Sequence, residues 1–229
     1  MDQINSSAFQ RLSDYIWSPD PNCAYVNSVI QDSPGLKLFN KDIKSGPSGV
    51  IFIGICQLIE NMFTQMPQEG NYIVIHRTND RSFTNEMYAK KPPSVKHIYT
   101  MDCAVIAPDV TAIPIGLASI GGYDNLIDTI PELPKAKTRV FVRYNVNNSG
   151  YTNERIASIP ILQSKPFCKV VTTQIPTDEF YKEITSHEFT MSLKGQGMDC
   201  LRTYQAIKLG SIPIVTDSIE MRQFSEMPI

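Results

Sequence analysis

The sequence has no excess of charge of either sign. Its 21 lysines and arginines stand against 23 aspartates and glutamates, which gives a formal net charge of −2 at pH 7. Proteins that bind nucleic acid usually carry a strong basic excess. We therefore expect no nucleic-acid partner.

The sequence also lacks a long apolar run. Its most apolar stretch, residues 49–62, is interrupted by Glu60 and Asn61, well short of the roughly 18 residues that a membrane-spanning helix needs. The first residues, MDQINSSAF, have neither the basic region nor the apolar region of a secretory signal. We therefore expect no transmembrane segment and a cytoplasmic location.

Cysteine and acidic metal-binding patterns are absent as well. The five cysteines are an odd number at scattered spacings, and none forms a Cys-x-x-Cys or Cys/His cluster. Such usage favours free thiols in a reducing compartment. No Asp-x-Asp occurs, nor a Walker loop or a nucleophile elbow. The sequence therefore predicts neither a bound metal nor a resident cofactor.

What is present is the material of a folded α/β protein. Hydrophobic residues make up 42% of the chain, which is ample for a core and argues against disorder. Strand-like and helix-like segments alternate on both sides of residues 130–137, a proline- and lysine-rich stretch that is typical of a linker. We expect two parallel-sheet, Rossmann-like halves, residues 1–134 and 135–229, with a cleft between them, which is the GT-B arrangement.

The individual elements are predicted from hydrophobic periodicity and from glycine and proline signals. The expected helices are 7–17, 50–66, 153–163, 178–186 and 199–209. The expected strands are 36–39, 72–76, 95–100, 111–115, 139–144, 168–172, 189–193 and 212–215.

The most informative segment is 189–215, FTMSLKGQGMDCLRTYQAIKLGSIPIV. A strand, a loop with Gly195 and Gly197, a helix and a second strand form a βαβ unit, which often carries a phosphate site. The helix N-terminus offers N–H groups and a partial positive charge, and Arg202 adds a guanidinium suited to phosphate. Asp199 is expected to cap this helix, and Thr203 to offer its hydroxyl to the phosphates.

Gly-x-Gly-x-Asp-Cys-x-Arg-Thr followed by Leu-Gly-Ser-Ile-Pro-Ile-Val resembles the donor-binding segment of exostosin-like glycosyltransferases, closest to the small stand-alone enzymes of algae and large algal viruses. Four further segments, NYIVIHRTND, VKHIYTM, IPIGL and RVFVRYNVNNSGYTNER, are similar to the family in the same order. The likeness covers roughly residues 70–229. The family continues through another strand and helix at its C-terminus, so we expect the second half to be shortened here.

The resemblance implies an inverting transfer from a nucleotide sugar, with UDP as the carrier and xylose as the sugar it suggests. It also implies a glycan acceptor, with fucose as the suggested sugar, and the host cytoplasm as the location of a viral enzyme. In the family, the arginine at the position of Arg202 contacts the diphosphate, and an acidic residue three positions later holds the ribose. This sequence has Gln205 at that position, which can hydrogen-bond to ribose hydroxyls without charge assistance.

Further donor-side candidates follow the expected strand 139–144. Arg143, Asn145 and Asn147 alternate along its end, where ligands bind in Rossmann-like folds. Arg155 opens the next helix and could meet a second phosphate charge. A solvated loop with a surface arginine is the competing interpretation.

On the acceptor side, the transfer needs a base that takes the proton of the attacking hydroxyl. Asp80 is the first candidate and His76 the second, because both follow the strand 72–76. An Asx turn at Asp80 and a structural histidine at His76 are the alternatives.

Two other functions stay open at this point. One is a catalytically weak or inactive nucleotide-sugar or carbohydrate-binding protein, which Gln205 and the short C-terminus favour. The other is a different α/β enzyme such as a nucleotide-sugar epimerase, but the dinucleotide fingerprint that it needs is not visible in the sequence.

Overall fold

The computed structural model describes residues 6–20, 22, 24–33, 35–39, 48–54, 58–77, 81–117, 126–143, 152–195 and 197–229. Its contacts divide the chain into a first unit, Met1–Ile115, and a second unit, Gly116–Ile229. The expected boundary at 134/135 therefore lies later than the observed one. Each unit contains a parallel sheet with helices, so the α/β class with two parallel-sheet halves is confirmed.

The first unit has a six-stranded sheet in the order β2-β1-β3-β4-β5-β6, in which every strand pairing is parallel. Its strands are β1 Tyr15–Trp17, β2 Lys37–Phe39, β3 Ser48–Ile53, β4 Asn71–His76, β5 Val95–Thr100 and β6 Val110–Ala112. Its described helices are α1 Ser6–Arg11, α2 Ala24–Asp32, α3 Ile59–Gln65 and α4 Asn85–Tyr88.

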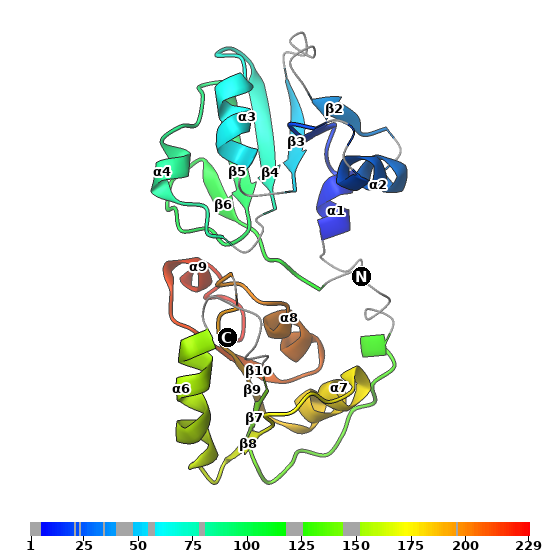
Figure 1. The fold of residues 1–229 in the computed structure, drawn as a ribbon, viewed down its shortest axis with the longest axis vertical. Coiled ribbons are helices and arrows are strands. Elements are labelled where there is room, and N and C mark those ends of the chain that lie inside the picture. Colours follow the sequence, from blue (N-terminus) through cyan, green and yellow to red (C-terminus); the bar gives the residue numbers. More distant parts are fainter. Residues whose placement is uncertain are drawn as a thin grey trace. The chain divides into compact units, whose positions relative to one another are not determined.

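Helices cover both faces of this sheet (Figure 1). Successive strand residues point to opposite faces, and β3 shows the result. Ile51 and Ile53 belong to the apolar cluster that includes Met62 of α3, whereas Phe52 belongs to the cluster that includes Val29 of α2. The sheet is therefore the middle of three layers.

The second unit has a four-stranded parallel sheet in the order β10-β9-β7-β8. Its strands are β7 Val140–Val142, β8 Cys168–Val170, β9 Phe189–Ser192 and β10 Ile212–Val215. The helices described in this unit are α6 Thr152–Gln163, α7 Thr177–Ser186, α8 Leu201–Lys208 and α9 Ile219–Arg222.

Strand β7, one of the two inner strands, shows how this second core is built. Phe141 packs with Tyr181 and Ile184 of α7 and with Ala206 of α8. Its neighbours on either side, residues 140 and 142, join a second cluster with apolar side chains of α6 and β8. Helices α6 and α7 thus cover opposite faces of the sheet (Figure 1).

The stretch expected to be a linker is part of the second unit. Ile127 and Ile130 pack into the Phe141 cluster. The ammonium of Lys135 donates hydrogen bonds to the carbonyls of Thr185 at 2.9 Å, and of His187 and Gly210 at 3.2 Å. Because α7 and α8 end near these carbonyls, a cation is favourable there. The proline-rich composition indicated a linker, but these contacts explain why the boundary comes earlier.

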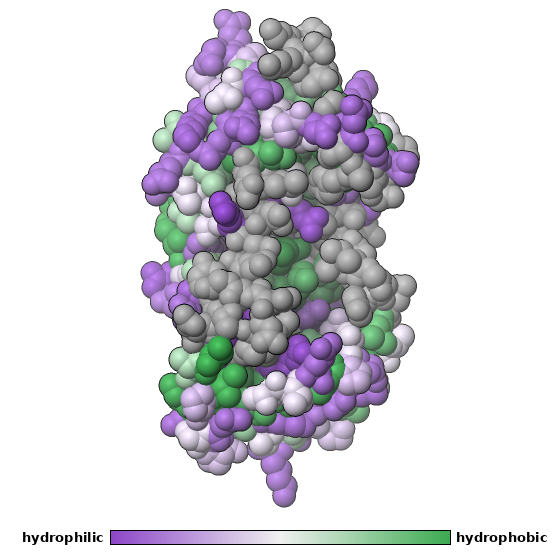
Figure 2. Space-filling view, viewed as in Figure 1, coloured by the Kyte–Doolittle hydropathy of each residue, from purple (hydrophilic) through white to green (hydrophobic). Residues whose placement is uncertain are grey.

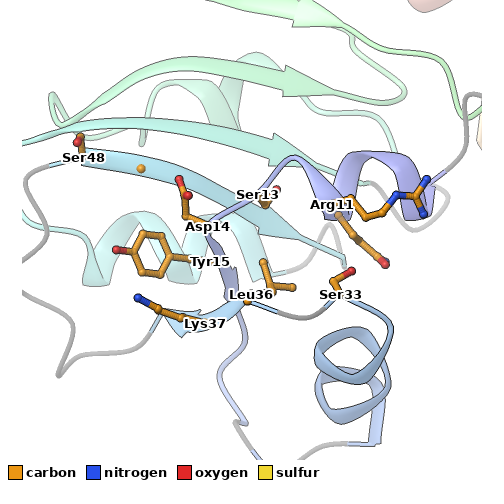
Figure 3. Close-up of a pocket in the computed structure, with 11 residues that line it drawn as sticks. Arg11, Ser13, Asp14, Tyr15, Ser33, Leu36, Lys37 and Ser48 are labelled. Carbon is orange, nitrogen blue, oxygen red and sulfur yellow. The ribbon is translucent and has the colours of Figure 1, made fainter.

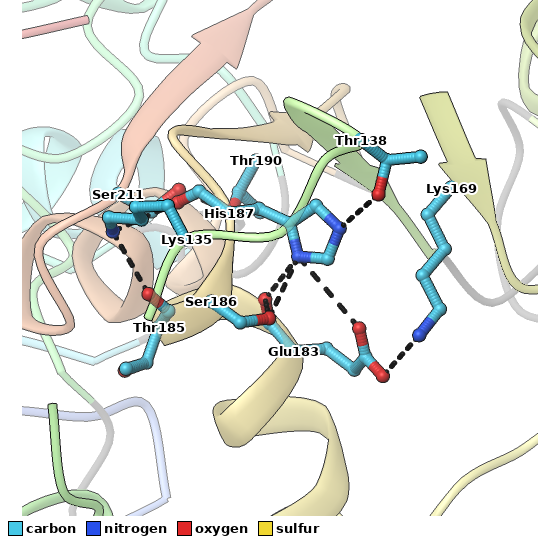
Figure 4. A network of polar contacts seen from close by, with 9 residues as sticks. All are labelled: Lys135, Thr138, Lys169, Glu183, Thr185, Ser186, His187, Thr190 and Ser211. Atoms are coloured by element: carbon cyan, nitrogen blue, oxygen red, sulfur yellow. Dashed lines mark hydrogen bonds and ion pairs between the residues drawn. The ribbon is translucent and has the colours of Figure 1, made fainter. Parts of the chain in front are cut away.

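His187 anchors a polar network beside Lys135 (Figure 4). The ring is 1% exposed. Its Nδ1 lies 2.7 Å from the Glu183 carbonyl and its Nε2 lies 3.0 Å from Thr138 Oγ1. The carbonyl can only accept, so Nδ1 carries the proton and Nε2 accepts from the threonine hydroxyl. This histidine is therefore structural, at the edge of the sheet where β7 and β9 begin.

Several predicted elements are confirmed within a few residues, among them the strands at 72–76 and 95–100 and the helix at 153–163. Two helix predictions are wrong. The expected helix 7–17 ends at Arg11 and is followed by strand β1, and the expected helix 50–66 divides into β3 and α3. Helices α2, α4 and α9 were not predicted.

Hydrophilic side chains cover much of the visible described surface (Figure 2).

In the second unit, β10 is an outer strand, and its Pro213 pairs in register with Thr190 of β9. No described helix is both long enough and apolar enough to cross a membrane.

Candidate functional site

The strand connections of the second unit diverge between β7 and β9. From β7 the chain passes through α6 to β8 on one side, and then through α7 to β9 on the other side. In open parallel sheets, ligands bind beyond the carboxyl ends of the strands at such a switch point. The loop after β9, residues 193–200, and Arg143 after β7 both follow these carboxyl ends. The sheet topology therefore brings the predicted phosphate loop to the expected ligand position.

Arg155 of α6 holds this loop in place. Arg155 is buried, with only 6% of its surface exposed. Its Nε donates to the Lys194 carbonyl at 3.0 Å, and its Nη2 donates to the Leu193 carbonyl at 3.4 Å. The surface-arginine alternative is thus excluded, and the guanidinium positions the loop whether or not it also meets a phosphate.

Gly195 has a steric reason to be glycine. A Cβ there would lie 3.2 Å from Arg155 Nη2 and 3.5 Å from the Cys200 sulfur. Its own N–H donates to the Gly197 carbonyl at 2.9 Å, which closes a tight turn. Glycine at position 195 therefore allows the backbone to approach the buried guanidinium closely.

Cys200 ties the loop to the start of α8. It is the N-cap residue, and its thiol reaches the carbonyls of Leu193 at 3.6 Å and Gly197 at 3.9 Å. Burial raises the pKa of the thiol, although the charges of Arg202 and Arg155 act in the opposite direction. Both guanidinium groups are thus close enough to act on the same sulfur atom, and Cys200 stays a neutral thiol.

The predicted cap of this helix is wrong. Helix α8 begins at Leu201, two residues later than expected, and the Cys200 N-cap makes no side-chain capping bond. The carboxylate of Asp199 instead accepts a hydrogen bond from Tyr204 Oη at 2.7 Å. The first turn of α8 therefore has no side-chain cap at the end that faces the loop, which suits an anion.

Two other predicted donor-side residues serve the packing of α8. Thr203, which is 1% exposed, lies with its Oγ1 3.0 Å from Ser192 Oγ at the end of β9. Gln205 donates through Nε2 to the Tyr181 hydroxyl of α7 at 3.2 Å. In this structure both side chains fix the helix rather than point to an open site.

Arg143 follows β7 and lies with its guanidinium carbon 5.9 Å from the centre of the Phe180 ring of α7. This distance is within the range of a cation–π contact. Asn145 and Asn147 lie outside the described residues, as does Asp80, the first candidate base. Their predicted roles stay predictions.

His76, the second candidate base, is the last residue of β4 and has no exposed surface. Thr100 Oγ1 donates to the Met101 carbonyl at 3.0 Å and lies 2.9 Å from His76 Nδ1. Because that hydroxyl proton is already used, Nδ1 must donate to Thr100, which leaves Nε2 as the acceptor nitrogen. Nε2 is buried without a hydrogen-bond partner among the described residues.

Burial lowers the pKa of His76 to about 3. A general base works best when its pKa lies near the working pH, so an imidazole this weakly basic is a poor proton acceptor. The geometry favours a neutral, structural His76 and leaves Asp80 as the stronger candidate base.

Asp102 was missed by the sequence reasoning. It is 4% exposed, has a backbone φ of 45°, and lies just beyond the carboxyl end of β5. A left-handed backbone at a non-glycine residue is costly and is often found at functional sites. The sequence did contain a signal for this residue, namely an acidic side chain that follows a strand closely. Because β4 and β5 are parallel neighbours and end at the same edge of the sheet, Asp102 could have been named as a candidate beside His76.

The low pKa of His76 predicts acid sensitivity. Between pH 6.5 and 3 the unfolded chain binds a proton that the folded protein excludes, so stability present above pH 6.5 is lost as the pH falls. The expected loss is about 2 kcal/mol at pH 5. Urea unfolding at pH 7 and pH 5 measures it.

His76→Gln should reduce this loss, because glutamine does not titrate. His97→Gln is the matched control: His97 is a half-buried imidazole on β5 whose Nε2 lies 2.8 Å from Thr111 Oγ1, and its replacement leaves His76 in place. An equal acid loss in wild type and His76→Gln would contradict the buried neutral imidazole.

In the part of the chain that the structure describes, no group of three or more histidine, cysteine or acidic side chains is arranged to hold a metal ion. Cys103, Cys168 and Cys200 are free thiols. Comparison with protein-family models and with curated proteins found no match to this chain.

Proposed function

We propose that this protein is an inverting, metal-independent glycosyltransferase of the GT-B type, which moves a sugar from a UDP-sugar to a hydroxyl of a glycan. One observation carries the proposal. The loop 193–200, the uncapped start of α8 and two arginines meet at the switch point of the second sheet. Xylose as the sugar and fucose as the acceptor are suggested by the exostosin-like resemblance alone.

In the proposed reaction the acceptor oxygen attacks C1 of the donor sugar. The bond from C1 to the diphosphate oxygen breaks, UDP departs with that electron pair, and Asp80 takes the hydroxyl proton. Arg202 and the N-terminal amides of α8 stabilise the charge that develops on the leaving diphosphate. Arg155 keeps the loop in the shape that this contact needs.

The proposal predicts that UDP stabilises the protein without a metal. A ligand that binds only the folded state at 100 times its Kd adds about 2.7 kcal/mol, which thermal unfolding with UDP, with and without EDTA, detects. ADP serves as the comparison nucleotide. No stabilisation by UDP or by UDP-xylose would contradict a donor site, and stabilisation that EDTA removes would contradict metal independence.

A second candidate is a nucleotide-sugar-binding protein without turnover. The hydrogen bond of Gln205 to Tyr181 and the low basicity of His76 favour it. Stabilisation by UDP together with no release of UDP from UDP-xylose, with or without glycan acceptors, would support this candidate. An activity that appears in Gln205→Glu would indicate that the charge at position 205 is what the wild type lacks.

A further inference from the structure

A polar cavity of about 710 Å³ opens in the first unit, at the edge where its strands begin. Tyr15, Lys37 and Ser48 are the first residues of β1, β2 and β3, and all three line it. Figure 3 shows these three toward one end of the cavity and Arg11 and Ser33 toward the other, with Ser13 and Leu36 between. His76 lies at the opposite side of the same sheet, where the strands end.

Two largely buried polar residues line the cavity, and their side chains form no hydrogen bond with another described residue. Gln10 is 7% exposed and Ser33 is 6% exposed. Neither the Gln10 amide nor the Ser33 hydroxyl bonds to another described residue. Their polar atoms are not among the buried atoms that lack a hydrogen-bond partner, so these groups are open to the cavity. A polar ligand in the cavity would replace water as their hydrogen-bond partner.

The backbone around the cavity is closely constrained. Gly49 has a φ of 157°, and a Cβ there would lie 2.6 Å from a ring carbon of Tyr15. Asp14 accepts a hydrogen bond from the Val50 N–H at 2.8 Å through Oδ2. The wall formed by β1 and β3 is thus fixed before any ligand arrives, which lowers the entropic cost of binding.

The charges around the cavity nearly balance. Arg11 and Lys37 are exposed and form no ion pair with a described residue. They are opposed by the Asp14 carboxylate and by the C-terminal ends of α1 and α2, which carry partial negative charge. Such a balance does not select an anion.

The chemistry that matches these walls is that of a sugar. Each hydroxyl of a sugar both donates and accepts, as do the amide of Gln10 and the hydroxyl of Ser33. The Tyr15 ring and Leu36 offer apolar surface to the C–H groups of a sugar ring. The cavity volume lies within the range of about 300–1,000 Å³ that small-ligand sites have.

We propose that this cavity binds a neutral sugar unit, at a site separate from the switch point of the second unit. The proposal goes beyond the transferase function and does not depend on it. A sugar held here would anchor a glycan to the first unit without taking part in bond making or breaking.

The test measures binding of glucose, galactose, mannose, fucose and xylose to the full chain by saturation-transfer NMR and calorimetry. Gln10→Ala should weaken binding about tenfold, which corresponds to one lost hydrogen bond. Because Gln10 is buried, a second variant is needed. Ser48→Trp places a large ring at the exposed rim and should abolish binding while leaving the core intact. Gln65→Ala, at an exposed position of α3 in the same unit, is the matched control and should bind as wild type does.

Binding of none of these sugars to the wild type would overturn the proposal, as would binding that Ser48→Trp leaves unchanged. Binding of glucose 6-phosphate or glucuronate without binding of glucose would overturn the assignment of a neutral ligand. UDP stabilisation measured on the same variants separates the two sites. Retained UDP binding together with absent sugar binding would overturn this proposal alone.

Discussion

Arg202→Ala is expected to weaken UDP binding more than any other single change in the loop 193–200 or the first turn of α8. Removing one partner of a buried, hydrogen-bonded charge pair costs about 2–5 kcal/mol, which is roughly a 30-fold to several-thousand-fold rise in Kd. Arg202 is the cation in the first turn of α8, directly beyond the predicted phosphate loop. Calorimetry with UDP measures the change.

Arg139→Ala is the matched control for this experiment. Arg139 precedes β7 at the opposite edge of the same sheet, where its exposed guanidinium pairs with Glu188 at 2.7 Å. Its loss should leave the Kd for UDP unchanged, since exposed ion pairs contribute little. A Kd in Arg202→Ala within twofold of the wild type would contradict the assignment of this loop to the diphosphate.

Arg155→Ala is expected to lower the free energy of unfolding by about 3 kcal/mol and to weaken UDP binding as well. The substitution removes the charged donor from two carbonyls, those of Leu193 and Lys194, and such bonds contribute about 1.5–3 kcal/mol each. The loop should then move away from α8. Urea unfolding measures the first effect and calorimetry with UDP the second.

Alkylation of Cys200 distinguishes a loosened loop from the simple loss of a phosphate contact. The Cys200 thiol reaches the same Leu193 carbonyl as Arg155, so its reaction with iodoacetamide, followed by mass spectrometry, should become faster in Arg155→Ala. Arg155→Lys keeps the positive charge but loses the planar guanidinium that donates to both carbonyls, and its Cys200 should be alkylated at an intermediate rate. Unchanged stability and an unchanged alkylation rate would show that Arg155 does not hold the loop.

The second unit was predicted from the sequence more accurately than the first. Its strands are short apolar runs bounded by glycine, proline or polar residues, and its helices have clear limits. The first part of the run from Val50 to Met66, residues 50–59, is interrupted only by Gly54 and Gln57, and a largely apolar run does not distinguish a buried strand from a helix. The structure ends β3 at Ile53 and begins α3 at Ile59.

Long-range pairing explains the other missed strand. Residues 15–17 follow α1 closely, and the sequence prediction joined the two segments in one long helix. In the structure the Asp14 carboxylate and its backbone bind Val50, so that β1 lies between β2 and β3. The sequence near residue 15 contains no sign of a partner 36 residues away.

For the candidate site, spacing predicted the loop but not the partners of its side chains. Two glycines, an arginine and a following helix were enough to locate the turn at the switch point. The engagement of Asp199 by Tyr204, and of Gln205 by Tyr181 on another helix, depends on how α8 packs. The buried position of Arg155 likewise depends on the approach of α6 to the loop after β9.

Pro213 bears on the solubility of the second unit. In the parallel ladder, Ile212 donates its N–H to Glu188 beside β9, so the next residue along β10 would direct its N–H outward. That residue is proline, which has no N–H to offer. A foreign strand that approached β10 would find a gap in its row of donors, and such gaps discourage edge-to-edge aggregation. Among the described strands, β10 has a neighbour only on the side of β9, so Pro213 leaves a gap in the row of donors on its other side, which substitution by valine would close.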